Sequence, residues 1–309
     1  MYYNISAEIA SALTKRKGIA MYTRIILVLG AVFLTGCPPS SVSSFITMDV
    51  PGSSATMILG IDGDRIVGCY WGDDSIPHGF LGSVEKKTFK TLDVPGTYST
   101  MLSGINGKTI VGWCWNDAED SNSHGCIYDM QAGIWTVLDA PQAKSTYLFG
   151  VDRSNIVGYY IGVAPDSIQH AFLYNVETEV WLSLDKPGDT TFPYGISSAM
   201  IAGSYEETGI THGCYRSIDD TWHTVDFPGA CTTEFCGIRC GIQGDIITGW
   251  WSNSGNANAY GFLYNVASQE FIPCNMPDAR TTYPSGLSGK TIVGYYQDDT
   301  YHGFVADSH

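Results

Sequence analysis

The sequence predicts an all-β protein, a six-bladed β-propeller built from four-stranded blades. Three observations predict it: a motif that recurs six times, a repeat length near 45 residues, and strands at both ends of the array that can pair. The chain has 309 residues, 44% of them hydrophobic and 15% charged, so it can bury a substantial core. Its 35 glycines and 19 tyrosines favour short strands and turns over helices.

Pairs of glycines eight residues apart mark the six copies of the motif. An Ile, Val or Leu follows each first glycine, and an apolar pair or its equivalent precedes each second glycine. A register held over six copies cannot arise by chance. The pairs are Gly60 and Gly68, Gly104 and Gly112, Gly150 and Gly158, Gly195 and Gly203, Gly241 and Gly249, and Gly286 and Gly294.

Two further steps recur in each copy. Downstream of the glycine pair is His-Gly-Phe or a variant, with Tyr260 replacing the His once; the histidines are His78, His124, His170, His212 and His302. Upstream is Asp-x-Pro or a variant, beginning at Asp49, Asp93, Asp139, Asp185, Asp226 and Asn275. These upstream residues are 44, 46, 46, 41 and 49 positions apart. Four strands in about 45 residues is typical of a propeller blade, whereas a leucine-rich repeat needs about 20–29 residues.

Each copy predicts four strands. The first ends near the first glycine, and a turn such as Asn106-Gly107 leads into the second, because Asn-Gly suits the positive φ of a type I′ hairpin. The third strand begins at the His step, for example His170 to Val176. The fourth, for example Trp135 to Asp139, ends before a Pro that cannot donate a hydrogen bond.

The two ends of the array predict a closed ring. A lone fourth strand, Phe45 to Val50, precedes the first copy, and the last copy stops after its third strand, His302 to Ala306. Pairing these two strands removes the free sheet edge at the seam, whereas an open stack leaves both unpaired. We therefore expect the propeller to span residues 45–309.

The Gly-Ile-Asn, Ile-Val-Gly and His-Gly-Phe steps over about residues 45–309 resemble the bacterial extracellular HAF-repeat family, named after its His-Ala-Phe step. His170-Ala171-Phe172 matches that step literally, whereas Tyr260, Cys126 and Cys214 depart from the pattern. The resemblance implies export and a repetitive β fold. The family has no established reaction or ligand to transfer.

Residues 1–36 predict an export signal. Arg24 precedes the ten apolar residues Ile25 to Leu34, a length that suits a signal-peptide core and is too short to span a bilayer. The sequence Leu34-Thr35-Gly36-Cys37 resembles a bacterial lipobox, which predicts a lipid on Cys37, a tether over residues 37–44 and a place at the outer membrane or cell surface. The alternative is an ordinary signal peptide with an incidental Cys. Met21 is an alternative start for this signal.

The chain is acidic, with a net charge of −15. Removal of residues 1–36 takes away four basic residues and one acidic residue, which leaves −18. Such a field disfavours nucleic acid and anionic lipid surfaces as partners and attracts cations or basic proteins. Apart from the lipid anchor, we expect a glycan or a basic protein as the partner.

Eight cysteines follow Cys37. An even number in an exported protein permits disulfides, and the absence of a C-x2-C pair disfavours zinc. We expect these cysteines to form disulfides or to be buried thiols. They are Cys69, Cys114, Cys126, Cys214, Cys231, Cys236, Cys240 and Cys274.

The repeated residues are interpreted as structural. Each repeated His is expected to form a hydrogen bond within its blade, with the repeated Asp as a suitable partner, rather than to bind a metal, and no cofactor is expected. The aromatic residues two positions after the second glycine, such as Tyr160, are expected to pack between blade faces.

The loops carry the variation between copies. The loop between the second and third strands and the crossing between blades emerge on one face, here called the long-loop face. Blade 5 is expected to enlarge this face, because Pro228 to Gly241 spans 13 residues against 8 or 9 elsewhere, and Cys231, Cys236 and Cys240 are expected to cross-link the insertion. Soluble surface is the alternative interpretation of the acidic loops. The candidate ligand-binding residues are Trp71, Asp73, Asp74, Trp115, Asp117, Asp120, Glu206, Glu207, Trp251, Asp298 and Asp299.

No G-x-S-x-G, H-E-x-x-H or Walker sequence is present, so no catalytic residue is predicted. The sequence favours a non-catalytic binding module at the cell envelope. A carbohydrate-active hydrolase or lyase that uses loop carboxylates is the first alternative. A purely structural envelope protein is the second.

Overall fold

The computed structural model describes residues 42–119, 122–165, 168–186, 189–197, 200–217, 221–239, 246–253 and 258–308. Within these ranges the chain is all β, with strands β1 to β24. None of the described residues forms a helix that could cross a membrane. The predicted signal segment, Cys37, Asp120 and Cys240 lie outside the described residues.

The strands follow the six copies of the motif, here called repeats 1 to 6. Repeat 1 contains β2 (Ala55–Asp62), β3 (Arg65–Trp71), β4 (Pro77–Ser83) and β5 (Thr88–Thr91). Repeat 2 contains β6 (Ser99–Asn106), β7 (Thr109–Trp115), β8 (His124–Asp129) and β9 (Ile134–Val137). Repeat 3 contains β10 (Ala143–Asp152), β11 (Asn155–Gly162), β12 (Gln169–Asn175) and β13 (Val180–Ser183).

The other three repeats continue the pattern. Repeat 4 contains β14 (Thr190–Ser197), β15 (Met200–Glu207), β16 (Ile210–Ser217) and β17 (Trp222–Thr224). Repeat 5 contains β18 (Thr232–Arg239), β19 (Ile246–Ser252), β20 (Tyr260–Asn265) and β21 (Glu270–Pro273). Repeat 6 contains β22 (Thr281–Ser288), β23 (Thr291–Gln297) and β24 (Tyr301–Ser308), and is completed by β1 (Val42–Thr47).

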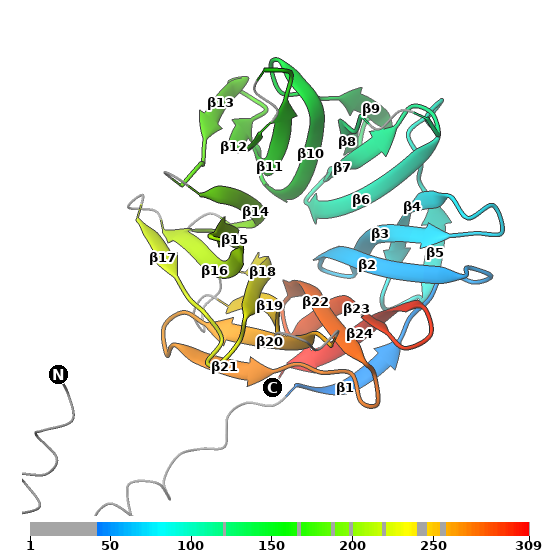
Figure 1. Ribbon diagram of the computed structural model, residues 1–309. Helices are drawn as coiled ribbons and strands as arrows, with labels where there is room; N and C mark the ends of the chain where they lie inside the picture. Colours follow the sequence, from blue (N-terminus) through cyan, green and yellow to red (C-terminus); the bar gives the residue numbers. More distant parts are fainter. Residues whose placement is uncertain are drawn as a thin grey trace, which may run out of the picture. The chain divides into compact units, whose positions relative to one another are not determined.

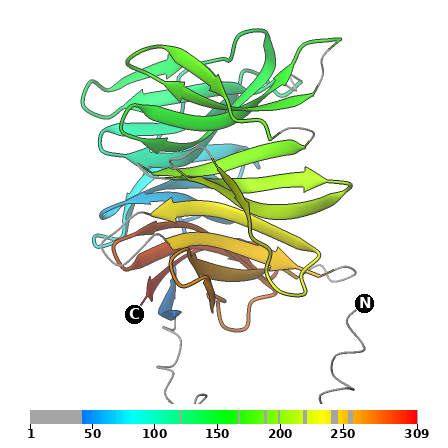
Figure 2. The ribbon, with the colours of Figure 1, turned by 90° about the vertical axis from the view of Figure 1, so that its left-hand side faces the viewer.

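The strands of each repeat pair in antiparallel order, as the hairpin turns predict. Four sheets have four strands, and a fifth has eight because one parallel pairing, Thr211 with Thr232, joins repeats 4 and 5. The sheets are arranged around a common centre, with β2, β6, β10, β14, β18 and β22 nearest to it (Figure 1). Seen from the side, the sheets lie as successive twisted layers (Figure 2).

The chain ends meet in repeat 6, as predicted, but with a different strand boundary. The sequence predicts a strand over Phe45 to Val50, whereas β1 covers Val42–Thr47. The reason is the length of β24, which extends to Ser308 and pairs with Val42. Phe45 packs against Phe304 with ring centroids 5.5 Å apart, which buries an apolar contact at this junction.

The predicted register of repeat 5 is wrong. Its first glycine is Gly237, which pairs with Thr248 as Gly60 pairs with Val67 in repeat 1. Gly241 therefore does not begin the pairing with Gly249, which faces Phe235. The insertion lies between β18 and β19, beyond the strand that bears Cys236, and not in the crossing that precedes β18.

The second glycine of each repeat makes room for the core. A Cβ atom on Gly158 would lie 2.0 Å from the carbonyl oxygen of Tyr147 and 2.9 Å from Phe172. Phe172, at the His-Ala-Phe step, is buried against this bare backbone. Cys126 and Cys214, which depart from the HAF pattern, occupy the same buried position in their repeats.

Candidate binding site at the centre of the repeats

The five repeated histidines each form the expected hydrogen bond to the repeated Asp. The Nδ1–Oδ2 distances are 2.8 Å for His78–Asp93, 2.8 Å for His124–Asp139, 3.1 Å for His170–Asp185, 2.9 Å for His212–Asp226 and 2.8 Å for His302–Asp49. The other carboxylate oxygen accepts a backbone N–H from the residue after the His in four repeats, for example at 2.6 Å from Ala171. The pair therefore joins the third strand to the crossing that leaves its repeat.

The aromatic residues two positions after the second glycine pack on this pair. Tyr160 stacks on His170 with centroids 5.1 Å apart, and the same stack occurs in repeats 1, 4 and 6. In repeat 5, Trp251 stacks on Tyr260 at 4.8 Å and on Phe227 at 4.5 Å with nearly parallel rings. Trp251, a candidate ligand-binding residue, thus packs against Phe227 and Tyr260 of its own repeat.

The acidic candidates lie in separate repeats. Asp73 and Asp74 follow β3, Asp117 follows β7, Glu206 and Glu207 end β15, and Asp298 and Asp299 follow β23. Asp74 Oδ2 is 3.0 Å from His78 Nε2, and Asp298 Oδ1 is 3.4 Å from His302 Nε2. Trp71 and Trp115 are half-buried at the ends of β3 and β7. None of these residues lines the cavity described next.

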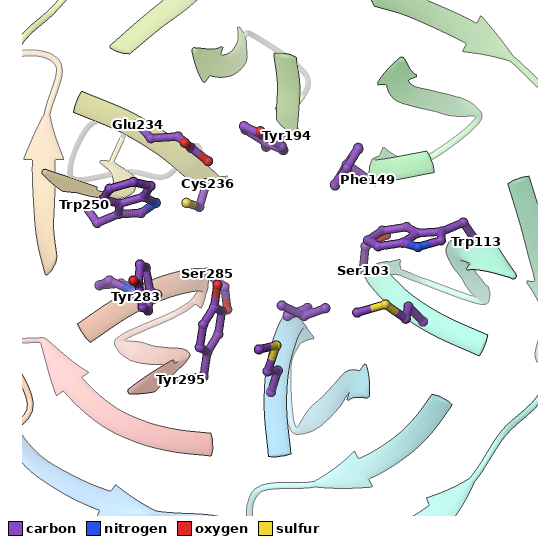
Figure 3. Close-up of a pocket in the computed structure, with 14 residues that line it drawn as sticks. Ser103, Trp113, Phe149, Tyr194, Glu234, Cys236, Trp250, Tyr283, Ser285 and Tyr295 are labelled. Carbon is purple, nitrogen blue, oxygen red and sulfur yellow. The ribbon is translucent and has the colours of Figure 1, made fainter. Parts of the chain in front are cut away.

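A cavity of about 230 Å³ lies at the centre of the repeats. Its wall comes from the innermost strands of all six repeats and from the second strands β7, β19 and β23, and it includes six aromatic rings (Figure 3). These rings belong to Trp113, Phe149, Tyr194, Trp250, Tyr283 and Tyr295. Met57, Leu59, Met101, Ser103, Glu234, Cys236, Pro284 and Ser285 complete the lining.

Strand alternation explains which side chains enter the cavity. Successive side chains of a strand point to opposite faces, so Glu234 and Cys236 line the cavity while Phe235 between them is fully buried in the core. The same rule separates Trp250, which lines the cavity, from Trp251, which packs within repeat 5. Most residues that line the cavity thus occupy one of three positions in a repeat. Two of these positions lie three residues and one residue before the first glycine, and the third lies one residue after the second glycine.

A second, smaller space lies on the hairpin side of the cavity. Each innermost strand starts at the long-loop face and ends at a hairpin, so residues early in the strand, such as Met57, lie nearer the long loops. The second space, of about 80 Å³, shares Leu59 and Cys236 with the cavity and continues along later residues of the same strands. Its lining includes Gly60, Gly104, Gly150, Gly195 and Gly286. The cavity therefore lies nearer the long-loop face than the second space does.

Among the described residues that line the cavity, Glu234 carries the only carboxyl group, and none is Lys, Arg or His. Burial raises its pKa to about 7, and a hydrogen bond with Tyr194 opposes this rise. Burial also raises the pKa of Tyr159 to about 12 and holds those of Tyr194 and Tyr295 well above their usual value. Glu234 is therefore the lining group whose charge changes near neutral pH.

The two serine hydroxyl groups of the wall are already engaged. Ser103 Oγ donates to the carbonyl oxygen of Leu148 at 2.7 Å, and Ser285 Oγ donates to that of Ile58 at 2.7 Å. Burial and the nearby Glu234 raise the pKa of Cys236 well above its usual value, although Trp250 contributes a hydrogen bond to this thiol. The thiol is therefore protonated at neutral pH and is a poor nucleophile.

Six of the described cysteines are free thiols. Cys69, Cys114, Cys126, Cys214 and Cys274 are buried, as one of the two interpretations requires, and Cys236 is half-buried, while Cys231 is exposed. The cross-link expected in repeat 5 involves Cys240, which lies outside the described residues, so it stays a prediction. Cys231 lies just before β18, whereas Cys236 lies on β18 and lines the cavity.

Sequence reasoning missed the cavity because its residues do not repeat. No single side-chain type occupies the matching position in all six repeats. The residues there are Met57, Met101, Tyr147, Phe192, Glu234 and Tyr283. Their common signal is position, three residues before the first glycine. The misplaced register at Gly241 hid this signal for Glu234.

No family model matches the chain, and no curated protein matches it. Among solved structures, TolB from Acinetobacter baumannii matches with a TM-score of 0.55 at 10% identity, over 80% of this chain and 65% of that one. The β-propeller domain of the Trilobed protease from Pyrococcus furiosus matches with a TM-score of 0.50 at 8% identity, over 82% of both chains. The chain thus spans about two thirds of TolB, and at these identities the likeness concerns the fold alone. The fold is a β-propeller.

Proposed function

We propose that this protein is a non-catalytic binding module whose ligand occupies the central cavity. The observation that carries the proposal is an aromatic wall around one carboxyl group. Large rings provide apolar contact area, and a single charged group fixes the orientation of a ligand, which is the usual composition of a small-molecule site. We place the entrance for the ligand at the long-loop face, because the cavity is lined by residues early in the innermost strands, which start at that face.

The proposal includes a closed ring of six blades. The pairing of β1 with β24 supports it, and so do the contacts of β2 with β22, β23 and β24. The single parallel pair between Thr211 and Thr232 joins repeats 4 and 5 into one sheet. Each of these two repeats still has its own four strands. A ring encloses its centre on all sides, which is the arrangement that a central site requires.

The proposed location is the cell envelope. The lipobox-like sequence before Cys37 and the resemblance to HAF repeats support a lipid-anchored protein at the outer membrane or cell surface. A glycan or a basic protein in that environment remains a candidate partner for the acidic long-loop face.

A hydrolase or lyase is less well supported. The cavity has one carboxyl group, whereas glycoside hydrolysis ordinarily uses two. Cys236 has no His beside it in the wall to act as a base. The loop acids are divided among several repeats, and Asp74 and Asp298 already contact histidines of their own repeats.

The test compares two neighbouring tryptophans. The purified chain is screened against glycans, amines and small neutral metabolites, and the binders are measured again with Trp250→Ala and Trp251→Ala. We expect Trp250→Ala to weaken binding at least about tenfold with little change in melting temperature, because its ring lines the cavity. Trp251→Ala is expected to lower the melting temperature, because its ring packs inside repeat 5.

Two outcomes contradict the proposal. The first is a ligand whose affinity is the same for Trp250→Ala and the native chain, which places the site elsewhere. The second is turnover of a polysaccharide that a single loop Asp→Asn change abolishes, which establishes the enzyme.

A further inference from the structure

We infer that the central cavity binds an organic ammonium group, either on a small molecule or at the end of a basic side chain. The inference rests on the proposed function and names the ligand class for the same site. Three features of the described wall carry it: the six aromatic rings, the carboxyl group without a basic residue beside it, and the engaged serine hydroxyl groups.

The aromatic rings favour a cation. Trp113 and Trp250 lie on different sides of the cavity, with Phe149, Tyr194, Tyr283 and Tyr295 between them (Figure 3). The face of an aromatic ring carries negative electrostatic potential, and a cage of several rings is the usual receptor for a quaternary ammonium group. The polarisable sulfur atoms of Met57 and Met101 add adaptable contacts for methyl groups.

Among the described residues that line the cavity, no basic side chain accompanies the carboxyl group. The described titratable groups that interact with Glu234 are Tyr159, Tyr194, Cys236, Tyr283 and Tyr295, and all are neutral at pH 7, because burial raises pKa values that ordinarily lie above 7 already. A charged carboxylate in such surroundings is costly unless an opposite charge accompanies it. A bound ammonium group supplies that charge at no cost to the packing.

The remaining polar groups disfavour a sugar. A sugar ring presents several hydroxyl groups that each need a partner in a closed site. The hydroxyl groups of Ser103 and Ser285 already donate to backbone carbonyls. The volume of about 230 Å³ is also below the roughly 300–1,000 Å³ of pockets for drug-sized ligands, so the site suits a single head group.

The charge of the whole chain acts in the same direction. Its net charge of −15 attracts cations from solution. Five acidic residues are exposed on loops of the long-loop face, namely Asp73, Asp74, Asp117, Asp298 and Asp299. The field therefore raises the local concentration of cations at the entrance.

The test uses a cation and a neutral molecule of the same shape. Isothermal titration calorimetry of the native chain compares choline with 3,3-dimethyl-1-butanol, in which carbon replaces the charged nitrogen. We expect choline to bind at least about tenfold more tightly than the alcohol. A peptide with one trimethyl-lysine then distinguishes the two sources: binding to the peptide but not to choline assigns a basic partner protein.

Glu234→Gln keeps the shape of the side chain and removes its charge. It is expected to abolish the preference for choline over the alcohol, and choline affinity in the native chain is expected to increase from pH 5.5 to pH 8 as Glu234 ionises. Equal binding of choline and the alcohol by the native chain contradicts the inference without any variant. Binding of neither ammonium probe also contradicts it, and the proposed function still stands if a neutral ligand loses affinity with Trp250→Ala.

Discussion

Repeats 3 and 5 solve the same packing problem with different chemistry. In repeat 3, the carboxylate of Asp185 accepts hydrogen bonds from the ring of His170 and from the backbone N–H of Ala171. In repeat 5, Tyr260 and Asn275 stand at the equivalent positions, and the backbone N–H of Gly261 donates to Asn275 Oδ1 at 2.9 Å. The two replacements belong together, because a carboxylate without its imidazole partner would carry an uncompensated charge at this junction.

The same two repeats differ again on the opposite face of their strands. The positions that hold Tyr147 and Phe149 in repeat 3 hold Glu234 and Cys236 in repeat 5. Side chains toward the core and toward the centre alternate along one strand, so they can change independently. The comparison teaches that the packing of a repeat does not constrain what it contributes to the cavity.

The largest effect that distinguishes the two repeats is expected at the stacked aromatic residue. Trp251→Ala removes a ring that contacts both Phe227 and Tyr260, and we expect it to lower the free energy of unfolding by about 3 kcal/mol. Tyr160→Ala in repeat 3 is the matched variant, with a smaller expected loss of about 2 kcal/mol because the ring is smaller. Urea unfolding followed by circular dichroism measures both, and an equal or reversed order would show that ring size does not set the stability of this stack.

The next effect concerns the junction itself. Asp185→Ala removes the hydrogen bonds from His170, Ala171 and Ser183 and is expected to cost about 2 kcal/mol, whereas Asn275→Ala removes the one from Gly261 and is expected to cost about 1 kcal/mol. Both are measured by urea unfolding at pH 7. The double change His170→Tyr with Asp185→Asn converts repeat 3 to the chemistry of repeat 5, and it is expected to cost less than the sum of the single changes. Strict additivity would mean that the pair of replacements in repeat 5 is a coincidence.

The smallest effect is a pH dependence that repeat 5 lacks. Burial lowers the pKa of His78, but hydrogen bonds to Asp93 and Asp74 outweigh this and raise it overall. A raised folded-state pKa stabilises the fold below the unfolded value of about 6.5, and this contribution is lost as the pH rises through the folded value. Asp74→Asn is therefore expected to destabilise the protein more at pH 5.5 than at pH 8.5. Thermal melts at both pH values measure it, with Tyr260→Phe as the control expected to show no such difference, and an equal effect at both pH values would exclude the charge on His78 as its cause.

The repeated part of the molecule was predictable from sequence, and the central part was not. Every repeat must pack against its neighbours, so the His–Asp pair and the buried Phe172 recur and reveal themselves by spacing. Glu234 and Trp250 are needed once, and their spacing resembles that of ordinary strand residues. Their shared direction appears only when six strands are placed around one centre, which no local pattern encodes.

Repeat 6 is assembled from both ends of the chain, and this sets an order of events in folding. Val42 pairs with Ser308, and the carboxylate of Asp49 forms a hydrogen bond with His302, which lies 253 residues further along the chain. Contacts between residues so distant in sequence form slowly, because a very large loop must close before they contribute. Synthesis proceeds from the N-terminus, so β1 has no partner strand until β24 has been made. Of the described strands, the first to be made thus waits longest for its partner.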